Sequence, residues 1–229
     1  MISYHCIWPI SMDICMIVLV GGEKGGTGKT TLTTNLAALR AQAGYDVLLV
    51  DTDRQGTAAG WCHVRQEILA RLRVACVQLF GQGLQAEVRD LATRYDDVLI
   101  DAGGRDSVEL RSALVVAQRA LIPILPSQYD VWTLDHMQEL VTAARGFNPT
   151  LDALVVLSRV SPNPLITDAH DAQLSLEHYP ALRLADTAVC ERQAYRRSAR
   201  QGEAVTELER PDTKASTEMR LLFEEVFHD

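Results

Sequence analysis

The sequence predicts an α/β fold whose mainly parallel, twisted sheet is covered by helices on both faces. Short runs of consecutive apolar residues, such as 16–20 and 47–50, alternate along the chain with longer segments of helical periodicity. Uninterrupted apolar runs are typical of strands that are buried on both faces, and strands that alternate with helices favour parallel pairing. The sequence contains no internal repeat, linker or low-complexity tract, so a single domain is expected over residues 16–229.

The expected elements follow in order along the chain. Apolar runs predict strands at 16–20, 47–50, 74–79, 98–100, 120–125 and 154–157, with a weaker one at 182–184. Helical periodicity predicts helices at 31–43, 84–94, 108–118, 133–145 and 166–177. Gly44 is suited to end the first of these helices, and Pro211 precedes a last helix that runs to Phe227. In such sheets the ligand lies beyond the carboxyl ends of the strands, so residues that directly follow strands are the functional candidates.

The charge and the cysteines exclude several classes of protein. The net charge is −8, so any contact with nucleic acid must come from a local basic patch. Five cysteines without a C-x-x-C pair indicate a reduced cytosolic chain rather than a disulfide framework or a zinc finger. Residues 1–15 lack the basic start and the cleavage site of a signal peptide, and are expected to be an extension outside the core. No apolar run approaches the ~18 residues of a membrane-spanning helix.

A glycine-rich loop between the first expected strand and the first expected helix is the strongest functional signal. It reads Lys24-Gly25-Gly26-Thr27-Gly28-Lys29-Thr30-Thr31. Glycines let successive backbone N–H groups turn toward an anion, and the helix start adds its positive end. Lys29 is expected to reach the β- and γ-phosphates of a nucleotide, and Thr30 to ligate Mg²⁺. A plain glycine-rich turn has no need of Lys-Thr-Thr at a helix start, so the loop predicts a P-loop fold that binds ATP and Mg²⁺.

The two lysines of this loop resemble the deviant Walker A motif of the ParA/MinD family of ATPases. A general P-loop begins with glycine where this chain has Glu23, whereas the family's motif begins at Lys24. The resemblance implies that Lys24 acts across an ATP-dependent homodimer, neutralising charge on the transferred phosphoryl group as an arginine finger does. It extends from Met16 to about Leu134, and 126–130 is similar to a family segment near the dimer face. Without a preceding helix-turn-helix, the chain resembles the small plasmid-type, ParF-like ParA proteins.

Aspartates follow two of the expected strands. Asp51 and Asp53 follow the second strand, and Asp101 ends the fourth in the manner of a Walker B carboxylate. A single aspartate after a strand is also suited to capping a helix, but Mg²⁺ prefers oxygen ligands. By resemblance to the family, Asp51 and Asp101 support the Mg²⁺ shell with Thr30, and Asp53 positions or activates the attacking water. Arg54 stands where the family's D-x-D-P-Q segment has proline.

The densest cluster of positive charge lies near the C-terminus at helical spacing. It consists of Arg192, Arg196, Arg197 and Arg200. Two interpretations stay open, a solvated helix face and a surface that contacts DNA phosphates without reading bases. Residues 191–203 are similar to the stretch that small ParA proteins use on nucleoid DNA, which implies non-specific DNA binding. The last helix is amphipathic but acidic, so membrane binding like that of the MinD tail is not expected.

The resemblance implies a slow, partner-stimulated ATPase that dimerises on ATP, binds DNA and drives plasmid or chromosome partitioning. The implied partners are a second copy of the chain, non-specific DNA, and a small centromere-binding ParB-like protein or another activator. The implied location is cytoplasmic, on the nucleoid. The same ATPase is also suited to positioning a protein cargo or to conjugation, and a P-loop kinase or synthetase for a small molecule is a further alternative.

Overall fold

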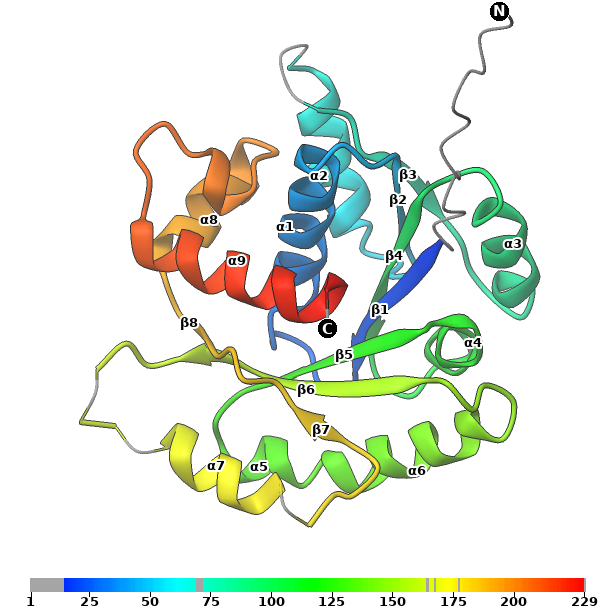
Figure 1. The fold of residues 1–229 in the computed structure, drawn as a ribbon, viewed down its shortest axis with the longest axis vertical. Coiled ribbons are helices and arrows are strands. Elements are labelled where there is room, and N and C mark those ends of the chain that lie inside the picture. Colours follow the sequence, from blue (N-terminus) through cyan, green and yellow to red (C-terminus); the bar gives the residue numbers. More distant parts are fainter. Residues whose placement is uncertain (1–14, 69–71, 164, 167, 177, 229) are drawn as a thin grey trace, which may run out of the picture.

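A parallel sheet forms the middle layer of the structure, and helices cover both of its faces (Figure 1). The computed structural model describes residues 15–68, 72–163, 165–166, 168–176 and 178–228. Its strands are β1 (Met16–Gly22), β2 (Val47–Asp51), β3 (Ala75–Gln78), β4 (Asp97–Gly104), β5 (Arg119–Ile124), β6 (Asp152–Val160), β7 (Arg183–Leu184) and β8 (Val189–Cys190). Its helices are α1 (Lys29–Gln42), α2 (Thr57–Gln66), α3 (Leu84–Leu91), α4 (Val108–Val116), α5 (Gln128–Val131), α6 (Leu134–Arg145), α7 (Asp168–Leu176), α8 (Gln193–Arg200), the 3₁₀ helix η1 (Val205–Glu207) and α9 (Thr213–Phe227). The predicted fold class is confirmed.

The order of the strands brings the functional loops together. The sheet runs β3-β2-β4-β1-β5-β6-β7, with β8 paired to β6, and all pairings within the described ranges are parallel. β1 is central, and its Val18 lies opposite Leu99 of β4 and Arg119 of β5. The loops that follow β1, β2, β4 and β6 therefore emerge at the same edge of the sheet, where ligands bind in folds of this kind.

Alternation along each strand divides the apolar core into two layers. In β1, Ile17 and Leu19 pack in the layer that contains α3, α4, α6 and α7, whereas Val18 and Val20 pack in the layer that contains α1, α2, α8 and α9. All four side chains are buried. Successive strand residues point to opposite faces, so a strand between two helical layers needs apolar residues at every position. This double coverage is the physical reason for the unbroken apolar runs in the sequence.

The element boundaries differ from prediction at a few points. α1 begins two residues before the expected start because Gly28 adopts a left-handed φ of 93° that turns the loop into the helix. Gly44 follows α1 with a φ of 96°, which agrees with its predicted role. Four elements were not predicted: α2, and the very short α5, β8 and η1. The expected extension at 1–15 lies outside the described residues, apart from Cys15. It stays a prediction, as does the single domain at 16–229.

Candidate nucleotide-binding site

The phosphate loop joins β1 to α1 and packs tightly against neighbouring strands. A Cβ atom on Gly28 would lie 2.8 Å from the Ser158 Oγ at the end of β6. A Cβ atom on Gly104, at the end of β4, would lie 2.9 Å from the backbone nitrogen of Gly25. Such distances exclude a side chain without movement of the loop, so the glycines allow the backbone to approach closely. The loop is thus held against two strand ends, with its own backbone forming the surface of the site.

Lys29 lies at the base of this loop and is 7% exposed. Its Nζ donates a hydrogen bond to the carbonyl oxygen of Lys24 at 2.5 Å. Burial lowers the pKa of Lys29, and the nearby carboxylates of Asp101 and Asp53 partly oppose that shift. An ammonium group that is poorly hydrated and flanked by glycine amides is well suited to a phosphate oxygen.

Asp101 and two threonines of α1 form the oxygen-rich part of the site. The Thr30 hydroxyl donates to Asp101 Oδ2 at 2.7 Å, and the Thr33 hydroxyl donates to Oδ1 at 3.1 Å. Burial raises the pKa of Asp101 to about 7, although these hydrogen bonds lower it. A cation beside this carboxyl would favour its charged form. No group of three or more His, Cys, Asp or Glu within the described ranges is arranged to hold a metal ion by itself. The donor set therefore fits Mg²⁺ that is shared with phosphate oxygens and waters.

The two aspartates after β2 differ in their surroundings. Asp51 is fully buried, and its oxygens accept the backbone N–H groups of Asp53 at 3.0 Å and Ala59 at 2.9 Å. It therefore fixes the turn between β2 and α2. Asp53 accepts the N–H of Gln55 at 2.9 Å and lines the cleft described below. The structure brings Asp53 to the same cleft as the loop, while the carboxylate of Asp51 serves the backbone behind it.

Lys24 is paired within its own chain. Its Nζ lies 3.1 Å from Asp130 Oδ2, and the Ser127 hydroxyl donates to the same oxygen at 2.5 Å. Asp130 is 3% exposed, whereas the Lys24 side chain is 38% exposed. The 126–130 segment and the phosphate loop are thus joined by an ion pair at the surface.

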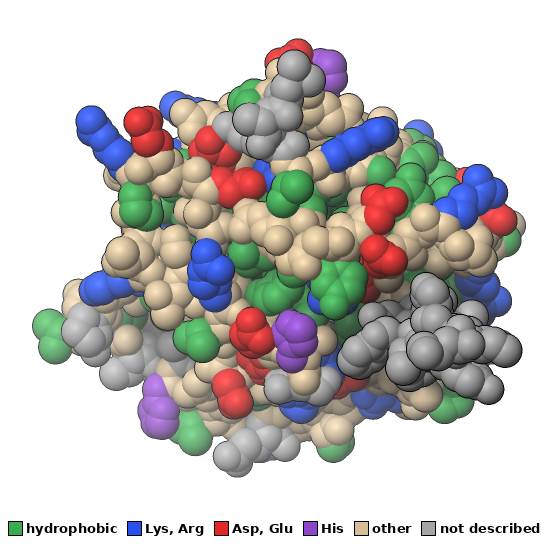
Figure 2. Space-filling view, turned by 45° about the horizontal axis from the view of Figure 1, so that its top comes forward, with side chains coloured by type: hydrophobic (Ala, Val, Ile, Leu, Met, Phe, Trp, Pro, Cys, Tyr) green, Lys and Arg blue, Asp and Glu red, His purple; other side chains and the backbone are tan. Residues whose placement is uncertain are grey.

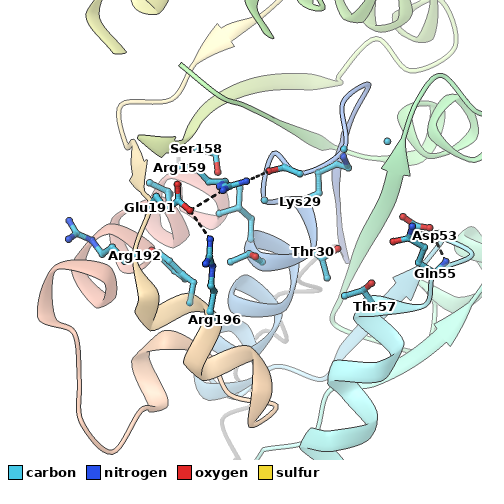
Figure 3. A pocket seen from close by; sticks show the side chains of 18 of the residues that line it. Lys29, Thr30, Asp53, Gln55, Thr57, Ser158, Arg159, Glu191, Arg192 and Arg196 are labelled. Carbon is cyan, nitrogen blue, oxygen red and sulfur yellow. Dashed lines mark hydrogen bonds and ion pairs between the residues drawn. The ribbon is translucent and has the colours of Figure 1, made fainter. Parts of the chain in front are cut away.

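A cleft of about 670 Å³ runs from the phosphate loop toward α8 (Figure 3). One end is lined by the loop, by Lys29 and Thr30 of α1, and by Asp53. Ser158 and Arg159 lie beside the loop, and the remaining lining residues are Val189, Cys190, Glu191, Arg192, Tyr195 and Arg196. The volume lies within the usual range of ligand pockets. Of the candidate phosphate residues 24–31, the cleft is lined by Gly25, Gly26, Gly28, Lys29, Thr30 and Thr31.

The four arginines of the C-terminal cluster do not form the single stripe that the spacing predicted. α8 begins at Gln193, so Arg192 precedes the helix. The guanidinium of Arg192 is largely buried against Glu218 of α9. Arg196 pairs with Glu191 at 2.9 Å. Arg197 and Arg200 instead line a second hollow of about 530 Å³. On the face shown in Figure 2, basic side chains lie scattered among acidic ones. Arg196, Arg197 and Arg200 lie exposed on α8, as the helical spacing predicted, whereas Arg192 lies at the start of the helix and pairs with Glu218.

Several residues of the cleft were not predicted from the sequence. Ser158 and Arg159 follow the apolar stretch of β6, so the rule that functional residues follow strands would have found them. Arg210, which lines the second hollow, lies outside the cluster and carried no signal. None of the helices within the described ranges combines the length and apolar character needed to cross a bilayer.

The chain is similar in sequence to several known proteins. The chain is 29% identical over 208 residues to the maintenance of carboxysome distribution protein A of Halothiobacillus neapolitanus, covering 90% of this chain and 94% of that protein. It is 33% identical over 162 residues to the protein of the same name from Gloeobacter kilaueensis, covering 70% of each. It is 29% identical over 187 residues to the chromosome-partitioning ATPase Soj of Thermus thermophilus, covering 69% of this chain and 74% of Soj.

Solved structures show the same fold. A variant of Cyanothece McdA in complex with ATP superposes with a TM-score of 0.77 at 18% identity, covering 93% of this chain and 96% of that one. MinD of Pyrococcus horikoshii with Mg-ADP gives 0.72 at 19% identity, with the same coverage. Residues 18–205 match the family described as the CobQ/CobB/MinD/ParA nucleotide binding domain. The resemblance noted in the phosphate loop is thereby confirmed, and the chain belongs to this family.

Proposed function

We propose that this protein is a Mg²⁺-dependent ATPase. The observation that carries the proposal is the meeting of Lys29, Thr30 and Asp101 beside a glycine loop at one end of a nucleotide-sized cleft. Lys29 and the amides of residues 24–31 hold the β- and γ-phosphates, and Asp53 orients the attacking water. Thr30 and Asp101 hold Mg²⁺, supported by Asp51, and the ion when bound neutralises charge on the phosphates. Lys29→Ala should abolish ATP binding in calorimetry, and undiminished affinity would contradict the proposal.

Hydrolysis is coupled to a homodimer in this proposal. Lys24 is the catalytic residue that the partner copy supplies, and it must leave Asp130 to reach across the interface. Lys24→Ala should therefore retain some ATP binding but lose hydrolysis and stable dimers. Asp53→Ala should accumulate an ATP-bound dimer, because the interface forms and turnover does not. Light scattering with ATP, with ADP and without nucleotide tests this. A monomer in every condition, for the wild type and Asp53→Ala alike, would refute dimerisation.

The dimer binds DNA non-specifically and so resides on the nucleoid in the cytoplasm. Arg197 and Arg200 are both exposed, and neither forms an ion pair with a described residue, so they are the strongest phosphate contacts of the cluster. Arg192 and Arg196 contribute less because Glu218 and Glu191 neutralise them. Dimerisation doubles the number of contacts, and each contact adds about −0.9 to the slope of log affinity against log salt.

A gel shift with non-specific duplex tests this part of the proposal. Wild-type binding should require ATP and fall steeply between low and moderate salt, and Arg197→Glu/Arg200→Glu should abolish it. Arg94→Glu/Arg145→Glu is a control with the same change in charge; Arg94 lies just after α3 and Arg145 is the last residue of α6. Equal loss in both variants would mean that net charge matters rather than this surface.

The cargo is a chromosome, a plasmid or a protein assembly, moved with the help of a ParB-like or other activating partner. Soj supports the first, and the relatives named for carboxysome distribution support a protein assembly. A protein cargo is the second candidate, and it is supported by the Halothiobacillus neapolitanus relative, whose similarity covers nearly the whole chain. Deleting the gene should raise DNA loss at division in the first case. In the second case DNA retention should stay normal while a protein assembly becomes unevenly distributed.

A further inference from the structure

Arg159 has an unusual backbone at the end of β6. Its φ is 55°, in the left-handed region that residues with a side chain rarely adopt. The pairing of β6 with β8 shifts register at this residue, because Ser158 lies opposite Val189 and Val160 lies opposite Cys190. Irregularities of this kind redirect a side chain and are common beside active sites. Here the redirected side chain lines the nucleotide cleft.

The two ends of the Arg159 guanidinium make different contacts (Figure 3). One nitrogen, Nη1, donates to the carbonyl oxygen of Gly26 in the phosphate loop at 2.8 Å. The other, Nη2, donates to Glu191 Oε1 at 2.9 Å. The same carboxylate oxygen accepts from Arg196 of α8 at 2.9 Å. The planar guanidinium suits this task, since it holds its donors in a fixed fork. Glu191 therefore anchors Arg159, and Arg159 anchors the loop.

The contact with Gly26 has a stereochemical consequence for the loop. In a trans peptide the C=O and the N–H point in opposite directions, and the described residues contain no cis peptide. A Gly26 carbonyl directed at Arg159 therefore directs the N–H of Thr27 the opposite way. Gly26 has a φ of 79°, and glycine permits either orientation of the following peptide, so an outside contact is needed to select one.

We propose that Arg159 is a positioning residue of the phosphate-binding site. It fixes the orientation of the Gly26–Thr27 peptide, and with it the shape of the loop that receives the phosphates, and Glu191 holds Arg159 in place for this task. The inference rests on the proposed binding of ATP by the loop. A residue at the end of β6 therefore fixes the conformation of the phosphate loop, which the residues of the loop do not fix by themselves.

The test compares three ligands in calorimetry with Mg²⁺: tripolyphosphate, ADP and ATP. Tripolyphosphate has neither base nor ribose, so it reports on the phosphate loop alone. Arg159→Gln should weaken all three by about tenfold or more, the range expected for loss of a charge-assisted hydrogen bond. Arg159→Lys should recover part of the loss, because one ammonium can reach either acceptor but cannot hold both. Arg220→Gln on α9 removes the same charge at an exposed site and should leave the three affinities unchanged.

Glu191→Gln tests the anchoring step by a second route that does not alter Arg159. It should weaken the same three ligands, and the double variant with Arg159→Gln should lose no more than Arg159→Gln alone, as expected of groups that act as a unit. Thermal melts establish that each variant is folded. An unchanged affinity for tripolyphosphate in folded Arg159→Gln would overturn the inference. A loss of affinity for ADP and ATP but not for tripolyphosphate would also overturn it, because that pattern indicates a contact with the base or ribose. A loss of affinity that spares ADP would overturn it as well.

Wild-type binding separates the role of Arg159 from ATP binding itself. If the wild type binds neither ATP nor tripolyphosphate, the proposed function fails, and this inference fails with it. If the wild type binds both, and folded Arg159→Gln and Glu191→Gln bind them equally well, only the role of Arg159 fails.

Discussion

At the scale of single residues, Asp130 is the side chain that most restrains the site. It is nearly buried, and its Oδ2 accepts hydrogen bonds from both Lys24 and the Ser127 hydroxyl. Its other oxygen, Oδ1, is buried without a hydrogen-bond partner in the described structure. The carboxylate therefore depends on Lys24 for its compensating charge. In the proposed dimer that charge has to be given up, so the ion pair opposes dimerisation.

Asp130→Asn should make dimerisation easier. The amide keeps the shape of the side chain but no longer holds the ammonium of Lys24 by charge. A partly exposed ion pair is worth up to ~1 kcal/mol, and a symmetric dimer breaks two of them, so the ATP-dependent dimer should form at up to about thirtyfold lower protein concentration. Light scattering across a dilution series measures this. Ser127→Ala is the control, since it leaves the ion pair intact and should dimerise more nearly like the wild type. A dimer that is weaker in Asp130→Asn would contradict the prediction.

The residues of the phosphate loop could be predicted from the sequence, but the fate of the arginines could not. Lys29 and Thr30 begin the helix that follows β1, and Asp101 lies near the end of the neighbouring strand β4. They meet because parallel strands end at one edge of the sheet. Arg192 and Arg196 are of the same type and four residues apart, yet one is buried and the other exposed. That difference depends on Glu218, which is 26 residues away on another helix. Local spacing carries no information about such a partner.

At the scale of elements, a buried ion pair joins α2 to the C-terminal part of the chain. Arg65 of α2 is 1% exposed and binds both carboxylate oxygens of Glu207 in η1, at 2.7 and 2.9 Å. It also donates to the carbonyl oxygens of Gly202 and Leu72. One guanidinium therefore holds three separate segments against the end of α2.

Arg65→Ala should destabilise the protein by about 3–5 kcal/mol, because it leaves the Glu207 carboxylate without its cation and two carbonyl groups without a donor. Urea unfolding followed by circular dichroism measures the change in the free energy of unfolding. Arg94→Ala is the matched control, since both side chains of its pair with Asp90 are more than 60% exposed. That pair should contribute less than about 1 kcal/mol. Equal losses in the two variants would show that burial is not the cause.

The predictability of each element depended on its length and on its burial. Strands covered on both faces, such as β1 and β4, were predicted because each contains consecutive apolar residues, at 16–20 and 98–100. α2 was not predicted, since it contains Gly60 and mixes polar with apolar residues along its length. β8 has only two residues, which is too few for any periodic pattern. Its position is set by pairing with β6, a contact between segments about 30 residues apart.

At the scale of the whole molecule, His136 connects parts of the protein that are distant in sequence. It lies on α6, and its ring nitrogens lie 3.3 Å from Asp106, 3.4 Å from Glu139 and 3.5 Å from Glu23 of the phosphate loop. Partial burial alone would lower the pKa of His136, but hydrogen bonds to Asp106 and Glu139 outweigh it and raise the pKa above the ordinary value of 6.5.

This shift predicts how stability depends on pH. Because the pKa of His136 is raised by folding, its contribution is complete below pH 6.5 and is lost as pH rises through the folded-state pKa. The melting temperature should therefore fall more between pH 6 and pH 8 in the wild type than in His136→Gln. His63→Gln, an exposed histidine of α2, is the control and should retain the wild-type dependence. If the melting temperatures of the wild type and His136→Gln change equally with pH, His136 does not cause this pH dependence.

The layered architecture followed from the sequence, whereas the order of the strands did not. Continuous apolar runs require cover on both faces, which fixes three layers. Which strand is central depends on pairings such as Val18 with Leu99 and Arg119, and apolar strands of similar composition do not encode these partners locally. The joining of the 126–130 segment to Lys24 depends on the same long-range arrangement.

The central position of β1 also determines when the site can exist during synthesis. The phosphate loop leaves the ribosome before its partners, because the carboxylate that meets Thr30 follows 71 residues later. The arginine that holds Gly26 follows 133 residues later. Until those segments emerge, β1 has neither of its neighbouring strands, and closing such long loops is slow. A nascent chain of this protein therefore carries its phosphate loop long before the residues that shape the loop are present.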